Sequence, residues 1–175
     1  MLRGLDISNM LIIDRLELGF QPGLNVLTGE TGAGKSVLLD AIGLAMGARS
    51  TGKALRDEQQ QAEITATLYV PSNGSASQWL SERDLLADAS TTRDEQGEAN
   101  LVAESEIILR RVIMPNGRNR AYINGVAVNI SDLKQLGSQL VDLHNQHEHQ
   151  SLPNTATHGS LLDDFAGHHG IAKKT

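Results

Sequence analysis

The sequence predicts a mixed α/β domain, and three local patterns support this fold class. Residues 63–70 alternate between apolar and polar side chains, as in a strand with one buried face. A glycine-rich turn at 29–34 leads into residues 37–46, where apolar side chains recur at helical spacing. Turn sequences at 115–117 and 124–125, each containing Asn-Gly, separate short strand-like runs and are typical of β-hairpins.

The composition limits the possible classes of function. The chain has 175 residues, enough for one domain with a buried core, and its net charge of −6 gives no overall attraction to nucleic acid. It contains no cysteine, which excludes disulfides and thiolate metal sites. The N-terminus has no signal-like apolar run, and no segment reaches the length of a membrane span. We therefore expect a cytoplasmic protein with no membrane partner, whose contacts with nucleic acid are local.

Strands are predicted before the glycine-rich turn. Apolar positions between residues 5 and 20 indicate two short strands joined by a turn at residues 9–10. Residues 24–28 form a third apolar run and are predicted to be the strand that enters the glycine-rich turn. The helix that follows is predicted to begin near Gly34 and to end at Gly47.

The rest of the chain is predicted to add a meander and a helix. Residues 71–105 are rich in Ser, Asp, Glu, Gly and Asn and are expected to form a surface excursion with a short helix at 78–86. Ser131 and Asp132 are predicted to cap a helix whose leucines recur at helical spacing. The strands of the meander are predicted at residues 107–113, 120–123 and 126–128.

Residues 29–36 match the phosphate-binding pattern G-x-x-x-x-G-K-[ST] at every fixed position. Glycines let backbone N–H groups approach phosphate oxygens, and the N-terminus of the following helix favours an anion. Lys35 is predicted to reach the β- and γ-phosphates, and Ser36 to offer its hydroxyl to a metal ion. The expected cofactors are therefore ATP and Mg²⁺. The predicted nucleotide-binding residues of this loop are Gly29, Glu30, Thr31, Gly32, Ala33, Gly34, Lys35 and Ser36.

The sequence offers no clear carboxylate for hydrolysis. Such an acid is usually found at the end of an apolar strand, where it holds the metal or orients water. The best candidates, Asp142 and Asp163, each follow only two apolar residues and are expected to be ordinary helix or strand ends. The chain is therefore predicted to be the nucleotide-binding half of a larger ATPase.

Three segments resemble the N-terminal half of the ATPase head of the RecN family, the bacterial SMC-like DNA-repair proteins. They read GLNVLTGETGAGKSVLLDAIGLAMGAR, EIILRRVIMPNGRNRAYINGVAV and LVDLHNQHEHQ, and they follow one another in the family's order. The resemblance covers residues 1 to about 167. It implies an α/β P-loop NTPase of the ABC/SMC head type, with a mixed sheet and an added antiparallel β meander, of which this chain is the N-terminal half only.

The resemblance also implies partners. Residues 1–175 would be the N-terminal lobe of a head that the C-terminal half of the same protein completes, with a coiled coil expected to begin after the C-terminal end. ATP would lie between two heads of a homodimer. Its binding and hydrolysis would control head dimerisation and DNA engagement during double-strand break repair and recombination, within the SOS response to DNA damage. The implied location is cytoplasmic and nucleoid-associated.

Two further residues match positions of the family pattern. Gln146, within the string NQHE, corresponds to a glutamine that follows a strand and reaches the Mg²⁺ and the attacking water. Arg56 corresponds to an arginine about twenty residues after the loop lysine that lies near the phosphates. The resemblance thus implies catalytic roles for Lys35 and Gln146, metal ligation by Ser36 and Gln146, and nucleotide contact by Arg56.

The chain departs from the family pattern in three respects. It has no L-S-G-G signature segment, no strand that ends in an Asp-Glu pair, and no long heptad region. The signature segment and the general base are therefore expected to lie outside this sequence. By itself the chain is expected to bind nucleotide weakly and to hydrolyse little.

Arg110, Arg111, Arg118 and Arg120 cluster across a predicted hairpin. Strand alternation places Arg110 and Arg111 on opposite faces, so at most part of the set forms one patch. Two interpretations remain open: edge charges that discourage aggregation, or contacts with the DNA backbone. The family resemblance favours DNA contact of a salt-sensitive, sequence-independent kind.

The histidines His144, His147 and His149 lie close together but lack the i, i+4 spacing of a zinc-binding pair. We expect them to be polar loop residues around Gln146 rather than metal ligands.

Two other functions compete with the ATPase head. A small complete P-loop kinase would have a similar length, but two predicted strands precede the loop and no arginine-rich lid is found. A non-enzymatic adaptor with a vestigial loop is disfavoured because Lys35 and Ser36 are both present.

Overall fold

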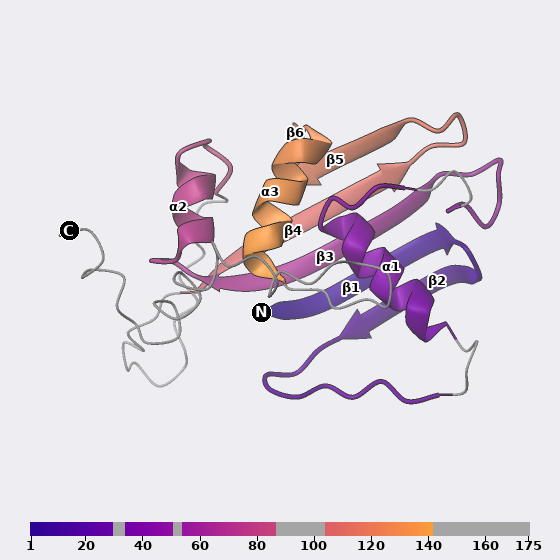
Figure 1. The fold of residues 1–175 in the computed structure, drawn as a ribbon, viewed down its shortest axis with the longest axis horizontal. Helices are drawn as coiled ribbons and strands as arrows, with labels where there is room; N and C mark the ends of the chain where they lie inside the picture. The colour runs from indigo at the N-terminus through magenta and orange to yellow at the C-terminus, as the bar shows by residue number, and fades with distance from the viewer. Residues whose placement is uncertain (30–33, 51–53, 87–103, 142–175) are drawn as a thin grey trace, which may run out of the picture. The chain divides into compact units, whose positions relative to one another are not determined.

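The fold is described over residues 1–29, 34–50, 54–86 and 104–141 in a computed structural model of the chain. Within these ranges the chain forms one six-stranded sheet and three helices (Figure 1). Gln146 and the histidines beside it lie outside the described residues, as do residues 30–33 of the phosphate loop.

The sheet has the strand order β2-β1-β3-β4-β5-β6, and every neighbouring pair in it is antiparallel. This confirms the strand predicted at 63–70 and the predicted three-stranded meander. The predicted parallel part of a mixed sheet is not seen among the described residues. The strands are β1 (Leu2–Met10), β2 (Ile13–Gly19), β3 (Ala62–Pro71), β4 (Glu104–Ile113), β5 (Asn119–Ile123) and β6 (Val126–Val128).

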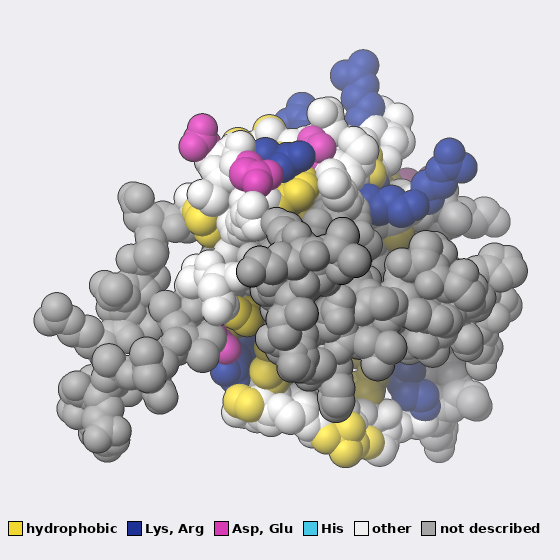
Figure 2. Space-filling view, turned by 60° about the vertical axis from the view of Figure 1, so that its left-hand side comes forward, with side chains coloured by type: hydrophobic (Ala, Val, Ile, Leu, Met, Phe, Trp, Pro, Cys, Tyr) yellow, Lys and Arg dark blue, Asp and Glu magenta, His cyan; other side chains and the backbone are white. Residues whose placement is uncertain are grey.

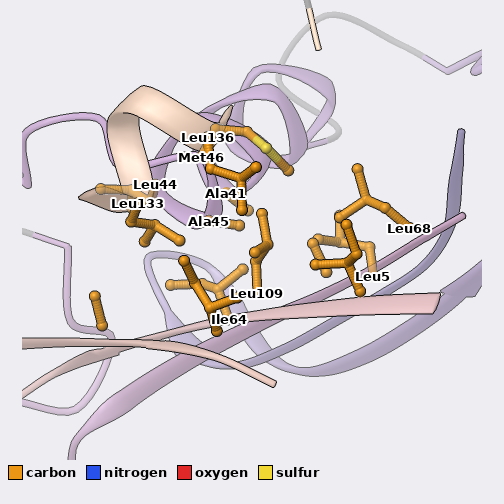
Figure 3. Close-up of a cluster of buried hydrophobic side chains, with 14 of the residues drawn as sticks. Leu5, Ala41, Leu44, Ala45, Met46, Ile64, Leu68, Leu109, Leu133 and Leu136 are labelled. Atoms are coloured by element: carbon orange, nitrogen blue, oxygen red, sulfur yellow. The ribbon is translucent and has the colours of Figure 1, made fainter. Parts of the chain in front are cut away.

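Helices α1 (Lys35–Ala45) and α3 (Ile130–Leu140) cover the same face of the sheet, and the shorter α2 is Ser75–Ser81 (Figure 1). The side chains of β3 that point to this face are apolar, which is why alternate residues of β3 are buried. No helix within the described ranges is long and apolar enough to cross a membrane. Figure 3 shows the core between the layers, formed by Leu5, Ile64, Leu68 and Leu109 of the sheet and by Ala41, Leu44, Ala45, Leu133 and Leu136 of the helices.

Two hairpin turns differ in how well the sequence predicted them. The turn between β5 and β6 is confirmed: Asn124 and Gly125 have φ values of 49° and 81°, as the favoured two-residue hairpin requires. The turn between β1 and β2 falls at Leu11 and Ile12, so the prediction of residues 9–10 was wrong. The chain reverses later because Asn9 belongs to β1 and has its side chain turned into the protein.

The predicted strand at residues 24–28 is not formed, and that prediction was wrong for this structure. Its apolar side chains face solvent, with Leu24 91%, Val26 73% and Leu27 54% exposed. A strand needs a neighbour to satisfy its backbone N–H and C=O groups. Among the described residues no strand pairs with this segment, so it does not join the sheet.

Two helix boundaries also differ from the predicted ones. Helix α3 begins at Ile130 with Asn129 as its N-cap, and no side chain caps it. Ser131 and Asp132 therefore lie inside the first turn, where Asp132 still opposes the positive end of the helix dipole. The short helix expected at 78–86 is α2, displaced toward the N-terminus, and it buries Trp79.

Helices α1 and α3 meet where two glycines remove side chains from the contact. A Cβ on Gly137 of α3 would lie 2.5 Å from the backbone oxygen of Met46, and one on Gly47 would lie 2.5 Å from the backbone nitrogen of Lys134. Gly47 also has φ +91°, which ends α1 as the sequence predicted. The backbones therefore approach at a distance that any larger residue would prevent.

We predict that Gly137→Ala destabilises the protein by about 1–3 kcal/mol, because the new methyl must push α1 away from α3. The helix propensity of alanine favours the change by up to about 1 kcal/mol, so the clash has to exceed this gain. Denaturant unfolding followed by circular dichroism measures the effect. Gly19→Ala is the matched control, since nothing lies within 4 Å of a Cβ there. Equal stability of the two variants would show that α1 and α3 are not held this closely.

Candidate nucleotide site

The described part of the phosphate loop ends in a left-handed residue followed at once by the helix. Gly34 is the N-cap of α1 with φ 90° and ψ 2°, and Lys35 is the first helical residue. The Lys35 ammonium donates a hydrogen bond to the carbonyl oxygen of Gly29, so the side chain folds back across the loop. Ser36 is exposed. Lys35 and Ser36 thus stand together at the open end of α1, as the sequence predicted.

The electrostatics at this end of α1 suit an anion. Unpaired N–H groups of the first turn give a helix N-terminus a partial positive charge. The first turn of α1 contains no acidic residue, and no side chain caps it. A helix N-terminus of this kind, with a lysine as its first residue, is typical of an anion-binding site.

Arg56 does not contact the described part of the phosphate loop by any hydrogen bond or ion pair. Its guanidinium pairs with Asp14, at 3.1 Å between Nη1 and Oδ1, on the strand β2. The predicted contact of Arg56 with nucleotide therefore remains a prediction. Asp14 was not identified from the sequence as part of a site, because it lies more than forty positions from Arg56 along the chain. For Asn9 the sequence favoured a structural role in the turn over an approach to the adenine or ribose of a nucleotide.

The arginine cluster divides between the two faces of the sheet, as strand alternation predicted for Arg110 and Arg111. Arg110 lies on the face without helices, where its guanidinium is 4.3 Å from the ring centre of Tyr122 and 3.5 Å from Glu63. Arg120 lies two residues before Tyr122 and is exposed, as is Arg118. These three arginines can form part of one surface around the β4–β5 turn.

Arg111 does not belong to that surface. It points into the core face and is 1% exposed, so in this arrangement it cannot contact DNA. Its Nη2 donates to the side-chain oxygen of Asn119 at 3.3 Å, whereas Nε and Nη1 have no partner among the described residues. Burial lowers the pKa of the guanidinium from its ordinary value. The sequence could not reveal which arginine is buried, because Arg110 and Arg111 are adjacent and both are flanked by apolar residues.

Because an unpaired charge is costly to bury, we predict that Arg111→Met leaves the free energy of unfolding unchanged or raises it by about 1–4 kcal/mol. Methionine fills a similar volume without a charge. Arg111→Lys, which keeps the charge with fewer donors, should be less stable than Arg111→Met. Chemical denaturation of the three proteins gives the order. A marked loss of stability in Arg111→Met would show that the guanidinium has an anionic partner outside the described residues.

The rest of the helix-free face is mixed or acidic. A hollow of about 390 Å³ over β1, β2 and β3 is lined by Asp6, Glu17 and Glu63, with Arg15 held by Glu17 at 2.6 Å. Figure 2 shows another side of the molecule, where the Lys and Arg side chains are not gathered into one patch and Asp and Glu side chains lie beside some of them. A DNA contact of this sheet would therefore be confined to the β4–β5 end.

Within the described ranges, no group of three or more His, Cys, Asp or Glu side chains is arranged to hold a metal ion. The histidines considered in the sequence lie in the part of the chain that is not described. The metal ligation predicted for Ser36 remains a prediction.

A glycine-rich sequence before the N-terminus of a helix, with a second helix on the same face of a sheet, is typical of an α/β domain of the P-loop class. The family model of the RecF/RecN/SMC N terminal domain matches residues 1–143. The chain belongs to this family. The resemblance to RecN proteins that the sequence suggested is thereby confirmed.

Curated relatives agree with the family. DNA repair protein RecN of Vibrio cholerae is 39% identical over 175 residues, which cover 100% of this chain and 29% of that protein. RecN of Haemophilus influenzae is 39% identical over 168 residues, with 96% and 28% covered. RecN of Bacillus subtilis is 35% identical over 167 residues, with 95% and 26% covered. The chain thus spans less than a third of these relatives and corresponds to their N-terminal part.

Solved structures show the same fold at low sequence identity. An SMC ATPase structure, from work on ATP-driven dimerization and DNA stimulated activation, has a TM-score of 0.54 at 17% identity and covers 94% of this chain and 98% of that one. The Smc head domain with coiled coil and joint from Pyrococcus yayanosii has a TM-score of 0.54 at 18% identity, covering 95% and 32%. The recombination mediator RecF-ATPrS has a TM-score of 0.53 at 16% identity, covering 76% and 29%. The predicted ABC/SMC head fold is confirmed.

Proposed function

We propose that this chain is the ATP-binding half of an SMC-like ATPase head that acts in the repair of DNA double-strand breaks. In the intact protein, ATP binding and hydrolysis would control the dimerisation of two heads and thereby their engagement with DNA. The observation that carries the proposal is the position of Lys35 as first residue of α1, directly after a left-handed Gly34. Family membership favours this function over the small kinase considered from the sequence.

The described residues fit Mg²⁺-ATP. The open N-terminus of α1 and the Lys35 ammonium suit the β- and γ-phosphates, and the exposed Ser36 hydroxyl suits the metal. When bound, ATP supplies the phosphoanhydride bond that water cleaves. Lys35 would neutralise charge that develops on the transferred phosphoryl group, while Gln146 is proposed to hold the metal with Ser36. The general base and the signature segment would come from the remainder of the protein.

The need for a second half is supported by the unpaired segment between β2 and the phosphate loop. Leu24, Val26 and Leu27 are each more than half exposed, although an apolar strand of this composition belongs in a sheet. Exposed apolar side chains beside free backbone groups favour the addition of a strand. We assign this surface to the C-terminal half of the same head, which the chain, at less than a third of its relatives' length, does not include.

DNA is the proposed partner of the arginines near the β4–β5 turn. Arg118 and Arg120 are exposed, and Arg110 is oriented by Tyr122 and Glu63. Guanidinium groups of this kind contact phosphates without reading sequence. Arg111 is not included in this proposal because it is buried.

We predict that ATP turnover and ATP-dependent dimerisation require a C-terminal head segment added to this chain. Both activities should be near background for the chain alone and should appear when the segment is co-expressed, since the general base lies outside this sequence. Lys35→Ala should abolish them by removing the ammonium that faces the phosphates. Phosphate release and light scattering measure the two activities. Steady turnover by the chain alone, or transfer of phosphate to a small acceptor, would contradict the proposal.

A second prediction concerns DNA binding by the same assembly. Arg118→Gln and Arg120→Gln should each weaken binding to two unrelated duplexes equally and reduce the slope of log affinity against log salt by about 1. Arg15→Gln is the matched control, because Arg15 is bonded to Glu17 within the acidic part of the sheet. Fluorescence anisotropy over a salt series gives the slopes. Variants that keep the wild-type slope would remove this surface from the DNA interface.

A further inference from the structure

The loop that carries Arg56 is attached to the end of β1 by the side chain of Asn9, which is 8% exposed. The Asn9 amide nitrogen donates to the carbonyl oxygens of Asp57 at 3.0 Å, Gln60 at 2.9 Å and Gln61 at 3.3 Å. Its side-chain oxygen accepts from the backbone N–H of Asp57 at 2.8 Å. One buried side chain therefore satisfies several backbone groups of a loop far away in sequence.

Backbone contacts hold the same loop on either side of Arg56. The Arg56 N–H donates to the Asn9 carbonyl oxygen at 3.2 Å, and the Leu11 N–H donates to the Ala54 carbonyl oxygen at 3.0 Å. Asn9 has φ 51°, a conformation that asparagine tolerates better than most residues. The backbone of Arg56 is therefore fixed to the β1–β2 turn.

The guanidinium of Arg56 is held less firmly than its backbone. Its partner Asp14 lies on β2, in the hairpin to which the backbone of Arg56 is bonded. The Arg56 side chain is 46% exposed and the Asp14 side chain is 86% exposed. An exposed ion pair of this kind contributes little and exchanges easily for a stronger anion. Phosphate oxygens bind a guanidinium through two parallel hydrogen bonds, which makes them such an anion.

The hairpin also lies near the described end of the phosphate loop. A Cβ added to Gly34 would lie 3.5 Å from the Cδ1 of Ile12, at the tip of the β1–β2 turn. The Ile12 side chain is 63% exposed. The turn to which the backbone of Arg56 is bonded is therefore close to the residue before Lys35.

We infer that Asn9 is a positioning residue that holds Arg56 beside the phosphate loop, and that Asp14 competes with the nucleotide for the Arg56 guanidinium. This inference rests on the proposed function and on the nucleotide contact that the family resemblance implies for Arg56. In the absence of nucleotide Asp14 neutralises Arg56. On nucleotide binding the guanidinium leaves Asp14 for a phosphate oxygen while Asn9 keeps the backbone in place.

A double-mutant cycle in the intact protein tests the competition. Affinity for a fluorescent ATP analogue with Mg²⁺ is measured by titration for wild type, Asp14→Asn, Arg56→Gln and the double variant. Asp14→Asn should tighten binding about two- to five-fold in the wild type, because it frees the guanidinium. The same change should have no effect in the Arg56→Gln background.

Asp40→Asn controls for the loss of one negative charge, since Asp40 lies on α1 and is not paired with Arg56. It should alter affinity equally in the presence and absence of Arg56. If Asp14→Asn also tightens binding in the Arg56→Gln background, its effect comes from the change in net charge and not from freeing Arg56. That result would overturn the inference. If no variant shows Lys35-dependent binding, the proposed function fails and the inference with it. If binding depends on Lys35 but Asp14→Asn leaves the affinity unchanged, the inference is overturned and the proposed function stands.

Asn9→Gly separates positioning from stability, because glycine accepts the positive φ of Asn9 while losing its side-chain bonds. It should weaken binding several-fold in the wild type and have no further effect in Arg56→Gln. Its effect on the melting temperature should be the same in both backgrounds. A loss of affinity that does not depend on Arg56 would make Asn9 a structural residue only.

Discussion

The burial of α1 against one face of the antiparallel sheet is the constraint on which the candidate site depends. Ala41, Leu44 and Ala45 are nearly inaccessible, so the helix can neither rotate nor shift without exposing them. Its N-terminus is fixed as a consequence, and Lys35 and Ser36 are fixed with it. Apolar packing one to three turns away thus positions the helix end that carries the candidate nucleotide-binding residues.

The approach of α1 to α3 completes this arrangement. Gly47 and Gly137 let the two backbones meet, and Leu133 and Leu136 of α3 close the core beside α1. At the other end of α1, Ile12 of the β1–β2 turn lies near Gly34, and the same hairpin is bonded to the loop of Arg56. The start of α1 therefore lies beside a hairpin, and its end packs against a second helix.

One face of the sheet is covered by helices, but the structure beside the phosphate loop is incomplete. Helices cover its apolar face, whereas the apolar residues at 24–28 lie unpaired in solvent. Two nitrogens of the buried Arg111 have no partner among the described residues, which points in the same direction, since proteins rarely bury a charge without an anion. Both features are consistent with a chain that covers 29% of its Vibrio cholerae relative.

The sequence by itself determined the local elements. Alternation predicted β3, paired turn residues predicted the meander, and the spacing of glycines with Lys35 and Ser36 predicted the phosphate loop and α1. These features depend on neighbours within a few positions, so they can be read along the chain. Residues 24–28 were predicted as a strand for the same reason, but strand formation also needs a partner, which the described chain does not supply.

Only the tertiary structure decided the contacts between distant segments. The burial of Arg111 and the exposure of Arg118 and Arg120 depend on which sheet face the helices cover. The pairing of Asp14 with Arg56, and the bonds from Asn9 to residues 57–61, join positions that sequence spacing cannot relate. The physical reason is that a hydrogen bond or ion pair depends on separation in space, and the fold sets that separation independently of position along the chain.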